Sequence, residues 1–280
     1  MTRLRATFAV VLLAAIGTVL AVAPATAAPS APEYVALGDS RAAAPTQGAS
    51  LRPDGCGRTP DAYPNRVAAQ LGITSRSVAC VNASTANVTT TPQLTLYGFR
   101  DVQTRALSRS TRLVTLSIGG NDLNWWSLIS SCFTRTYGPD AECRNDQDVA
   151  KRIDSGLASL APKIAKTLTA VTNRAPNARV ILVGHGGYYG PTGCAGQANI
   201  SDRDAAYVLE FFQRFNAALR NAAEARSLTF VDVATAAAGH DACAGPARWF
   251  EGNASQSSTQ PRHPTPLGSR AIADLVLAAI

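Results

Sequence analysis

The residue types around Ser40 are suited to nucleophilic chemistry. Ser40 follows Gly38 and Asp39 directly after the apolar run 34–37, so its hydroxyl is expected at the carboxyl end of a strand. Open α/β sheets carry their reactive groups at that end of their strands. A serine hydroxyl by itself is a poor nucleophile, because it needs a base and donors for a developing oxyanion. The rest of the chain must therefore supply both.

A candidate donor for the oxyanion is Asn121. It belongs to the segment Gly-Gly-Asn-Asp at 119–122, which follows the apolar run 113–118 and would reach the same sheet edge as Ser40. A neutral side-chain amide suits an oxyanion, and one such donor contributes about 100- to 1,000-fold in rate. The same residues also favour a turn with a purely structural role, and this segment alone leaves that alternative open.

The chain has three histidines that could act as the base, since the pKa of imidazole suits proton transfer near neutral pH. His263 lies in a loop before the predicted last helix, free to reach the strand ends, and we expect it to be the base. His185 follows the strand ending at Val183 and is the main rival, or a residue lining the substrate site. His240, close to Cys243, is interpreted as part of the loop structure.

Five apolar runs predict the strands that position these residues. The runs are 33–37, 77–80, 113–118, 179–183 and 229–233. Because helical patterns lie between them, we predict an α/β fold with a mainly parallel sheet covered by helices on both faces. Segments rich in glycine and proline are expected to form loops at 43–60, 134–146, 186–200 and 239–262.

Several helices can be located by apolar spacing and end signals. Apolar residues recur on one helix face from Val149 to Val171, and Pro162 is expected to divide this stretch into two helices because it lacks a backbone N–H. Ser201 is the predicted N-cap of a later helix, and Thr265 precedes the final one.

The first residues have the pattern of a targeting segment. Two arginines precede an apolar run at 6–22, and small residues suited to signal peptidase follow at 25–27. A membrane anchor is the alternative, but prolines follow the run and stop-transfer charges do not. We expect residues 1–27 to be a signal peptide. The protein is then secreted with no stable membrane span, and residues 28–280 form a single catalytic domain.

The six cysteines occur without CxxC or Cys/His ligand spacing. In an exported chain this even number predicts three disulfides, and sequence alone does not choose among the pairings. A zinc site is the weaker alternative, because none of the three histidines lies at ligand spacing to a cysteine pair. We predict that no metal or organic cofactor is required.

The formal net charge is +7, and arginines are densest at Arg100, Arg105, Arg109 and Arg112. They have no interleaved aromatic residues, so a solvated surface explains them better than nucleic-acid binding. Attraction to anionic lipid or to a cell-surface polymer stays open. The expected partner is a small-molecule or lipid ester, with no nucleic acid, and the protein is expected to be a monomer.

Considered together, the motifs resemble a known family. They occur in the order of blocks I, III and V of the SGNH (GDSL) hydrolases, and the resemblance covers nearly the whole mature chain. It is strongest to the secreted, disulfide-containing actinobacterial lipases and esterases. The matching motifs are Gly38-Asp39-Ser40, Gly119-Gly120-Asn121-Asp122 and His263-Pro264.

The resemblance implies a flavodoxin-like three-layer α/β/α sandwich. It also implies that the cysteines pair sequentially, as Cys56–Cys80, Cys132–Cys143 and Cys194–Cys243.

The resemblance also implies the role of each site residue. Ser40 is the nucleophile and its backbone N–H the first oxyanion donor, Asn121 donates its side-chain amide, and His263 is the base. The remaining donor is the backbone N–H of Asn82, which stands where block II has glycine. Asparagine keeps the N–H, but its Cβ restricts the backbone more than glycine does.

Two further positions depart from the family pattern. Many relatives carry aspartate three residues before the histidine, where this chain has Gln260. We expect a Ser-His dyad in which a backbone carbonyl orients the imidazole, and the carbonyl of Gln260 is the candidate. The alternative is a catalytically impaired site. A neutral orienting group stabilises imidazolium less than a carboxylate, which predicts modest turnover. Arg41, beside Ser40, either attracts an anionic substrate group or points to solvent.

These residues predict a secreted serine esterase or lipase that acts through an acyl-Ser40 intermediate. The aromatic pairs Trp125-Trp126 and Tyr188-Tyr189 are candidates for an acyl pocket, although ordinary packing explains them equally well. Two alternatives remain: a carbohydrate O-deacetylase, and a catalytically weak or inactive secreted binding module on the same fold.

Overall fold

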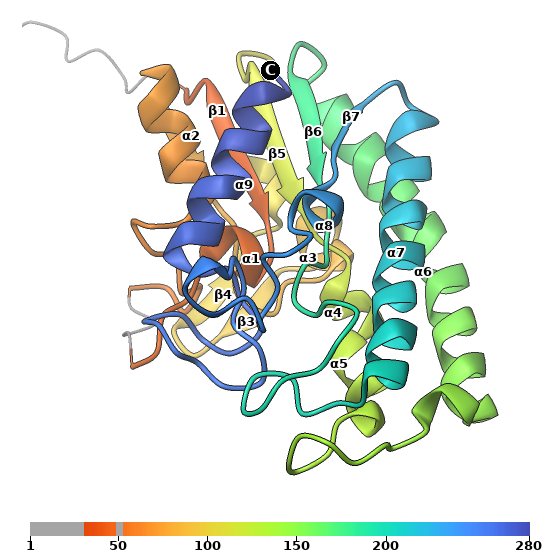
Figure 1. Cartoon of the computed structure of the whole chain (residues 1–280). Helices are drawn as coiled ribbons and strands as arrows, with labels where there is room; N and C mark the ends of the chain where they lie inside the picture. The colour runs from red at the N-terminus through yellow and green to blue at the C-terminus, as the bar shows by residue number, and fades with distance from the viewer. Residues whose placement is uncertain (1–30, 49–52) are drawn as a thin grey trace, which may run out of the picture. The chain divides into compact units, whose positions relative to one another are not determined.

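A five-stranded parallel sheet lies at the centre of the computed structural model, which describes residues 31–48 and 53–280 (Figure 1). The strand order is β2-β1-β5-β6-β7, and every neighbouring pair is parallel. Parallel strands are covered on both faces, which explains why every residue of β1 and β5 is buried. The strands are β1 (Tyr34–Gly38), β2 (Ser75–Ser77), β5 (Leu113–Ser117), β6 (Arg179–Val183) and β7 (Thr229–Val231).

Helices form the two outer layers. Helix α2 (Tyr63–Leu71) packs against α9 (Pro266–Ala278), and α6 (Gln147–Arg174) packs against α7 (Asp202–Glu224). The two pairs lie on opposite sides of the sheet (Figure 1). The predicted three-layer α/β/α arrangement is therefore confirmed.

Short elements occupy the connections. The structure has a two-stranded antiparallel hairpin of β3 (Gln93–Thr95) and β4 (Gly98–Arg100). The short helices are α1 (Ser40–Ala43), α3 (Thr85–Thr89), α4 (Gly120–Leu123), α5 (Trp125–Ile129) and α8 (Val233–Ala236), with 3-10 turns at Gln103–Ala106, Ser130–Cys132, Cys143–Asn145 and Gly245–Ala247.

The predicted N-cap at Ser201 is confirmed, and Thr265 caps the final helix in the same way. The Ser201 hydroxyl accepts a hydrogen bond from the Asp204 N–H at the start of α7, at 3.2 Å. The Thr265 hydroxyl accepts one from the Gly268 N–H at the start of α9, at 3.0 Å. Each bond satisfies one of the donors that a helix leaves unpaired in its first turn.

The predicted break at Pro162 is wrong, because α6 continues through it to Arg174. Pro162 and its neighbours Ala161 and Lys163 are exposed, so water can solvate the carbonyl that loses its donor. On the opposite side of the helix, buried apolar residues continue from Val149 to Val171. Packing of that continuous face outweighs the local cost of the proline.

The bounds of the second strand were also predicted wrongly, since β2 covers Ser75–Ser77 rather than 77–80. This strand forms one edge of the sheet, where polar residues are tolerated. A prediction from apolar residues therefore misplaced it. The chain still follows β1 beyond Ser77, because the Cys80 N–H bonds the Gly38 carbonyl at 3.0 Å.

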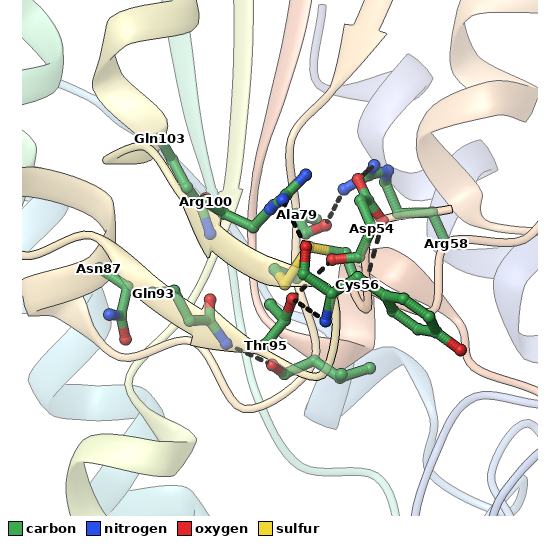
Figure 2. Close-up of a disulfide and its surroundings, with 12 residues drawn as sticks. Asp54, Cys56, Arg58, Ala79, Asn87, Gln93, Thr95, Arg100 and Gln103 are labelled. Atoms are coloured by element: carbon green, nitrogen blue, oxygen red, sulfur yellow. Dashed lines mark hydrogen bonds and ion pairs between the residues drawn. A yellow bond between two sulfur atoms is a disulfide. The ribbon is translucent and has the colours of Figure 1, made fainter. Parts of the chain in front are cut away.

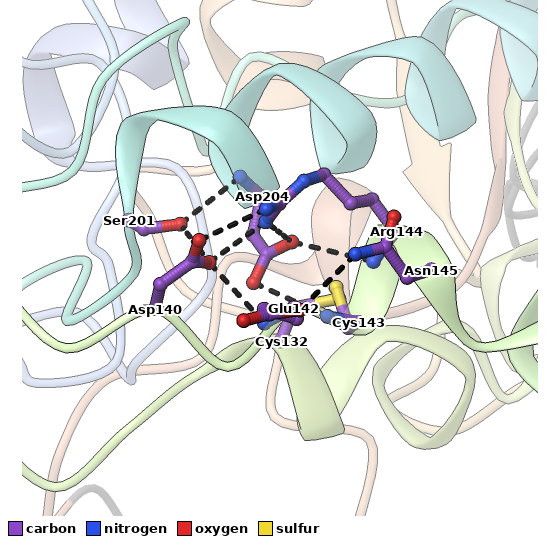
Figure 3. Close-up of polar contacts among 8 residues, drawn as sticks. All are labelled: Cys132, Asp140, Glu142, Cys143, Arg144, Asn145, Ser201 and Asp204. Atoms are coloured by element: carbon purple, nitrogen blue, oxygen red, sulfur yellow. Dashed lines mark hydrogen bonds and ion pairs between the residues drawn. A yellow bond between two sulfur atoms is a disulfide. The ribbon is translucent and has the colours of Figure 1, made fainter.

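All three disulfides that the resemblance implied are present. Cys56–Cys80 fastens the loop before α2 to the segment after β2 (Figure 2). Cys132–Cys143 closes a short loop beside α7 (Figure 3), and Cys194–Cys243 joins two of the predicted loops.

The buried carboxylate of Asp204 supports the short loop of Figure 3. It accepts from the Arg144 guanidinium at 2.9 Å and from the Cys143 N–H at 3.3 Å. Arg144 also pairs with Asp140, so one arginine joins the loop to the first turn of α7. These partners satisfy a polar group that would be costly to bury alone.

The predicted signal peptide at 1–27 lies outside the described residues. The contacts from Ala31 to Ile280 define one unit. Among the helices of the described ranges, none combines the length and the hydropathy required to cross a bilayer.

Candidate active site

Ser40 lies at the first residue of α1, immediately after β1. The strand ends at Gly38, whose φ of +143° favours glycine, and a Cβ there would lie 2.4 Å from the Ser117 carbonyl oxygen. The Gln103 side chain bonds the Gly38 N–H at 2.7 Å and the Gly38 carbonyl at 2.8 Å. The buried Asp39 then caps α1 by accepting from the Arg41 N–H. This turn holds Ser40 at the carboxyl edge of the sheet.

A pocket of about 440 Å³ at this edge is lined by Ser40, Asn82, Asn121, Gln260 and His263. Ser40 and His263 are half-buried in it, and Asn82 and Asn121 are more exposed. In the described part of the chain, no hydrogen bond joins the Ser40 and His263 side chains. The lining includes Asp39, Ser40, Arg41, Val81, Asn82, Asn121, Trp125, Trp126, His185, Tyr188, Pro261, Arg262 and His263.

Asn82 has a left-handed backbone conformation, with a φ of +64°, in the region that favours glycine. Asparagine tolerates this region better than other residues with a Cβ. The neighbouring Val81 N–H bonds the Cys56 carbonyl at 3.1 Å, which ties this segment to the disulfide loop.

Asn121 lies in α4, and one hydrogen of its amide bonds the Ala83 carbonyl at 2.8 Å. The neighbouring Asp122 carboxylate accepts from the Thr85 N–H at 2.9 Å and from the Thr85 hydroxyl at 2.5 Å. These bonds fasten the segment that carries Asn82 to α4. Since an amide NH₂ has two hydrogens, one remains for a ligand in the pocket.

The His263 ring is held by the carbonyl of Pro261, with Nδ1 and the oxygen 2.8 Å apart. The expectation that Gln260 would supply this carbonyl is wrong, because Gln260 turns toward the Pro45-Thr46 segment instead. Arg262 has a φ of +60°, a local reversal that brings the carbonyl two residues before the histidine to its ring. In neutral imidazole, Nδ1 then carries the proton and Nε2 is a free acceptor.

Burial lowers the pKa of His263 below its ordinary value of 6.5. The hydrogen bond to Pro261 and the negative charge of Asp39 act in the opposite direction, whereas the positive charges of Arg41 and Arg262 add to the effect of burial. The ring is therefore neutral at neutral pH and able to accept a proton.

The two other histidines are placed differently. His185 is buried beneath the pocket, its Nε2 lies 3.5 Å from the Asp39 carboxylate, and burial lowers its pKa. His185 therefore lines the active-site pocket, which is one of the two roles predicted for it. His240 stacks on Trp249 with ring centroids 4.7 Å apart, and it lies in the loop, outside the lining of this pocket.

A family model for the GDSL-like Lipase/Acylhydrolase family matches residues 36–271. The chain belongs to this family. It is therefore a serine ester hydrolase of the lipase and esterase kind.

Similar proteins come from streptomycetes. The chain is 34% identical to Lipase 2 of Streptomyces coelicolor over 264 residues, covering 90% of this chain and 86% of that protein. It is 30% identical to a lipase of Streptomyces rimosus, covering 82% of each. A crystal structure of the extracellular lipase of Streptomyces rimosus has 26% identity and a TM-score of 0.69, covering 88% of this chain and 99% of that one.

One residue of this GDSL hydrolase has surroundings that sequence reasoning missed. Arg41 is 3% exposed, so the expectation that it points to solvent is wrong. Its guanidinium donates to the Gly184 carbonyl at 3.2 Å and to the Tyr188 hydroxyl at 2.5 Å. It also stacks on the rings of Tyr188 and Phe250. Arg41 thus anchors the loop after β6 beneath the pocket.

Part of the predicted aromatic lining is present in this hydrolase. Trp125, Trp126 and Tyr188 line the pocket, and the rings of Trp125 and Tyr188 stack at 5.2 Å. Tyr189 is buried outside the lining, where its hydroxyl donates to Asn253 at 2.6 Å. Arg262 covers Trp126 with its guanidinium 4.2 Å from the ring centroid, so the rim beside His263 is packed rather than open.

Proposed function

We propose that the protein is a secreted esterase or lipase that cleaves carboxylic esters through an acyl-Ser40 intermediate. One arrangement carries this proposal. Ser40, His263, Asn82 and Asn121 line one pocket, and the Pro261 carbonyl leaves His263 Nε2 as a free base. A nucleophile, an oriented base and oxyanion donors around one cavity are what acyl transfer requires.

The reaction has two halves. His263 Nε2 takes the Ser40 proton as the serine oxygen attacks the ester carbonyl carbon, and the carbonyl oxygen becomes an oxyanion. The N–H groups of Ser40 and Asn82 and the Asn121 amide hold that oxyanion. As the bond to the alcohol breaks, His263 returns the proton to the leaving alkoxide. Water then repeats the sequence, releasing the acid and restoring the Ser40 hydroxyl.

The neutral Pro261 carbonyl stabilises the transient imidazolium less than a carboxylate would. Asp39 supplies negative charge from beneath the pocket, and that charge raises the pKa of His263 in opposition to burial. We therefore expect turnover that is modest but not abolished.

Three observations support an apolar acyl group and export. Trp125, Trp126 and Tyr188 place aromatic rings next to the proposed nucleophile, which suits an acyl chain. The three disulfides are typical of proteins that fold in an oxidising compartment. The name of the Streptomyces rimosus relative as an extracellular lipase agrees with secretion.

A fluorophosphonate probe tests the proposed nucleophile directly. The folded, disulfide-intact protein should form a covalent adduct, and peptide mass spectrometry should locate it at Ser40. Heat-denatured protein should not react, because an unfolded serine has no adjacent base. Absence of an adduct on folded protein would support the inactive binding module, and an adduct at another serine would overturn the assignment of Ser40.

The pH profile of kcat/KM follows from the lowered pKa of His263. The base must be neutral, so activity should persist below pH 6.5, the ordinary value for histidine, and decline only at a lower inflection. Titrimetric assays on a soluble ester can measure this profile.

A circular dichroism control is needed at each pH. His185 and His263 both have lowered pKa values, so the unfolded state binds more protons as the pH falls and stability decreases. An inflection above 6.5 while the protein stays folded would contradict His263 as the base.

A further inference from the structure

The hairpin of β3 and β4 presents large apolar side chains to solvent. Leu94 is 68% exposed, Leu96 82%, Tyr97 38% and Phe99 69%. These are four of the seven large apolar residues that are exposed in the described part of the chain; the others are Leu71, Tyr137 and Ile280. Exposed apolar residues scattered singly need no explanation, but a cluster on one short element marks an interaction surface.

Two of these apolar residues, Leu94 and Phe99, share one side of the hairpin. Leu94 pairs with Phe99 across the two strands, so their side chains lie next to each other on the same face. Gln93 and Thr95 on the other face are anchored to the protein, as Figure 2 shows, whereas the Arg100 guanidinium donates to the Tyr97 carbonyl within the hairpin. The alternation of the strands thus turns a continuous apolar face outward.

The anchoring is extensive. The Thr95 hydroxyl donates to the Asp54 carbonyl at 2.8 Å, and the Gln93 amide donates to the Val81 carbonyl at 2.7 Å. Gly55 packs so closely that a Cβ on it would lie 2.5 Å from Thr95 Cβ. The apolar face is therefore presented on a fixed support, and little conformational freedom is lost when it binds.

A basic cavity adjoins the hairpin. It has a volume of about 1060 Å³, and its lining includes Phe99 together with four arginines and two aspartates. In the described part of the chain, Arg76 and Arg100 form no ion pair, whereas the other two arginines, Arg58 and Arg105, pair with Asp54 and Asp101. Two positive charges are thus uncompensated beside the apolar face.

Two donors in this cavity lack a partner. Arg100 Nε and Ser77 Oγ are both buried without a hydrogen bond. A buried donor without an acceptor is costly, and a guanidinium is well matched to phosphate oxygens. The Arg76 and Arg100 guanidinium groups therefore present positive charge to an anionic headgroup beside side chains that suit its acyl chains.

We propose that the β3–β4 hairpin and its adjoining arginine cavity form a docking surface for anionic phospholipid. The apolar face enters the boundary between headgroups and acyl chains while Arg76 and Arg100 bind phosphate. An anionic polysaccharide would use the arginines but would leave Leu94, Leu96 and Phe99 in water. The apolar cluster thus favours lipid over polymer.

The β3–β4 hairpin is connected to the pocket that contains Ser40. Gln93 of the hairpin bonds Val81, and Val81 and Asn82 line the pocket that contains Ser40. The hairpin is therefore joined to the segment that lines the pocket. Binding of this kind does not depend on the chemistry at Ser40, so it can be measured separately from hydrolysis.

Vesicle co-sedimentation tests the proposal. The protein should bind vesicles of phosphatidylcholine mixed with phosphatidylglycerol, and it should bind pure phosphatidylcholine vesicles more weakly. The double variant Leu94→Ser/Phe99→Ser should bind the mixed vesicles at least about tenfold more weakly, because two large apolar side chains no longer enter the interface. Arg76→Gln should reduce binding to the mixed vesicles by about fivefold and leave binding to pure phosphatidylcholine unchanged.

Tyr137→Ser is the matched control, since it removes an exposed aromatic residue outside the hairpin, 46% exposed, and should bind like the unmodified protein. Turnover of a water-soluble p-nitrophenyl ester should be equal in all these variants. An unmodified protein inactive on that ester but bound to vesicles would overturn the proposed function alone. Unchanged vesicle binding by the double variant, or binding to a soluble anionic polysaccharide but not to vesicles, would overturn the docking surface.

Discussion

Replacing His263 by alanine should lower kcat on a soluble ester by at least about 10,000-fold while KM changes little. The reason is chemical: without a base, the Ser40 proton has no acceptor as its oxygen attacks. His263 lines the pocket, and the Pro261 carbonyl fixes its Nδ1, which leaves Nε2 as the free acceptor. Steady-state kinetics on a p-nitrophenyl ester would measure both constants.

Two further variants make the His263 result specific. His240→Ala removes a ring that stacks on Trp249 outside the lining of the pocket, so it should keep full activity. His185→Ala removes a pocket-lining ring beside Asp39. Comparing it with His263→Ala shows which of the two histidines is the base. If His185→Ala lost activity to the same extent and His263→Ala remained active, the base would be His185. Added imidazole should partly restore His263→Ala, because the deleted ring leaves space in the pocket.

Local sequence was sufficient to find the residues at strand ends. Ser40 and Asn121 both follow buried strands, β1 and β5, which lie side by side in the sheet. Adjacent parallel strands bring their carboxyl ends together, so an apolar run followed by glycine and a polar residue predicts the site. His263 was found for a related reason, because a capped helix begins immediately after it.

The errors arose where a contact depends on distant residues or on a single backbone angle. Pro261 rather than Gln260 orients His263 because Arg262 has a positive φ. An arginine in the sequence does not predict that backbone conformation. Arg41 points inward because Tyr188, 147 residues away in sequence, accepts its hydrogen bond. The hairpin at Gln93–Arg100 has apolar residues at alternate positions, but the sequence does not show whether they face the core or solvent, whereas the structure shows Leu94 and Phe99 exposed.

Replacing Asn121 by alanine should lower kcat by about 100- to 1,000-fold, the effect of losing one oxyanion donor. Its amide already gives one hydrogen to the Ala83 carbonyl, which fixes the orientation of the other toward the pocket. A donor fixed before the reaction stabilises the oxyanion without reorganisation, so the loss should fall on kcat rather than on KM.

Stability must be measured beside the rate, because Asn121→Ala also breaks the bond to Ala83. That bond is worth about 1 kcal/mol, small against the roughly 5–15 kcal/mol that holds a domain folded. Asn65→Ala is the matched control: its amide donates to the Thr59 carbonyl at 2.9 Å, outside the lining of the active-site pocket. It should lose comparable stability and keep its activity. A decrease of less than about tenfold in Asn121→Ala, or one confined to KM, would remove Asn121 from the oxyanion hole and leave the backbone N–H groups of Ser40 and Asn82 as its donors.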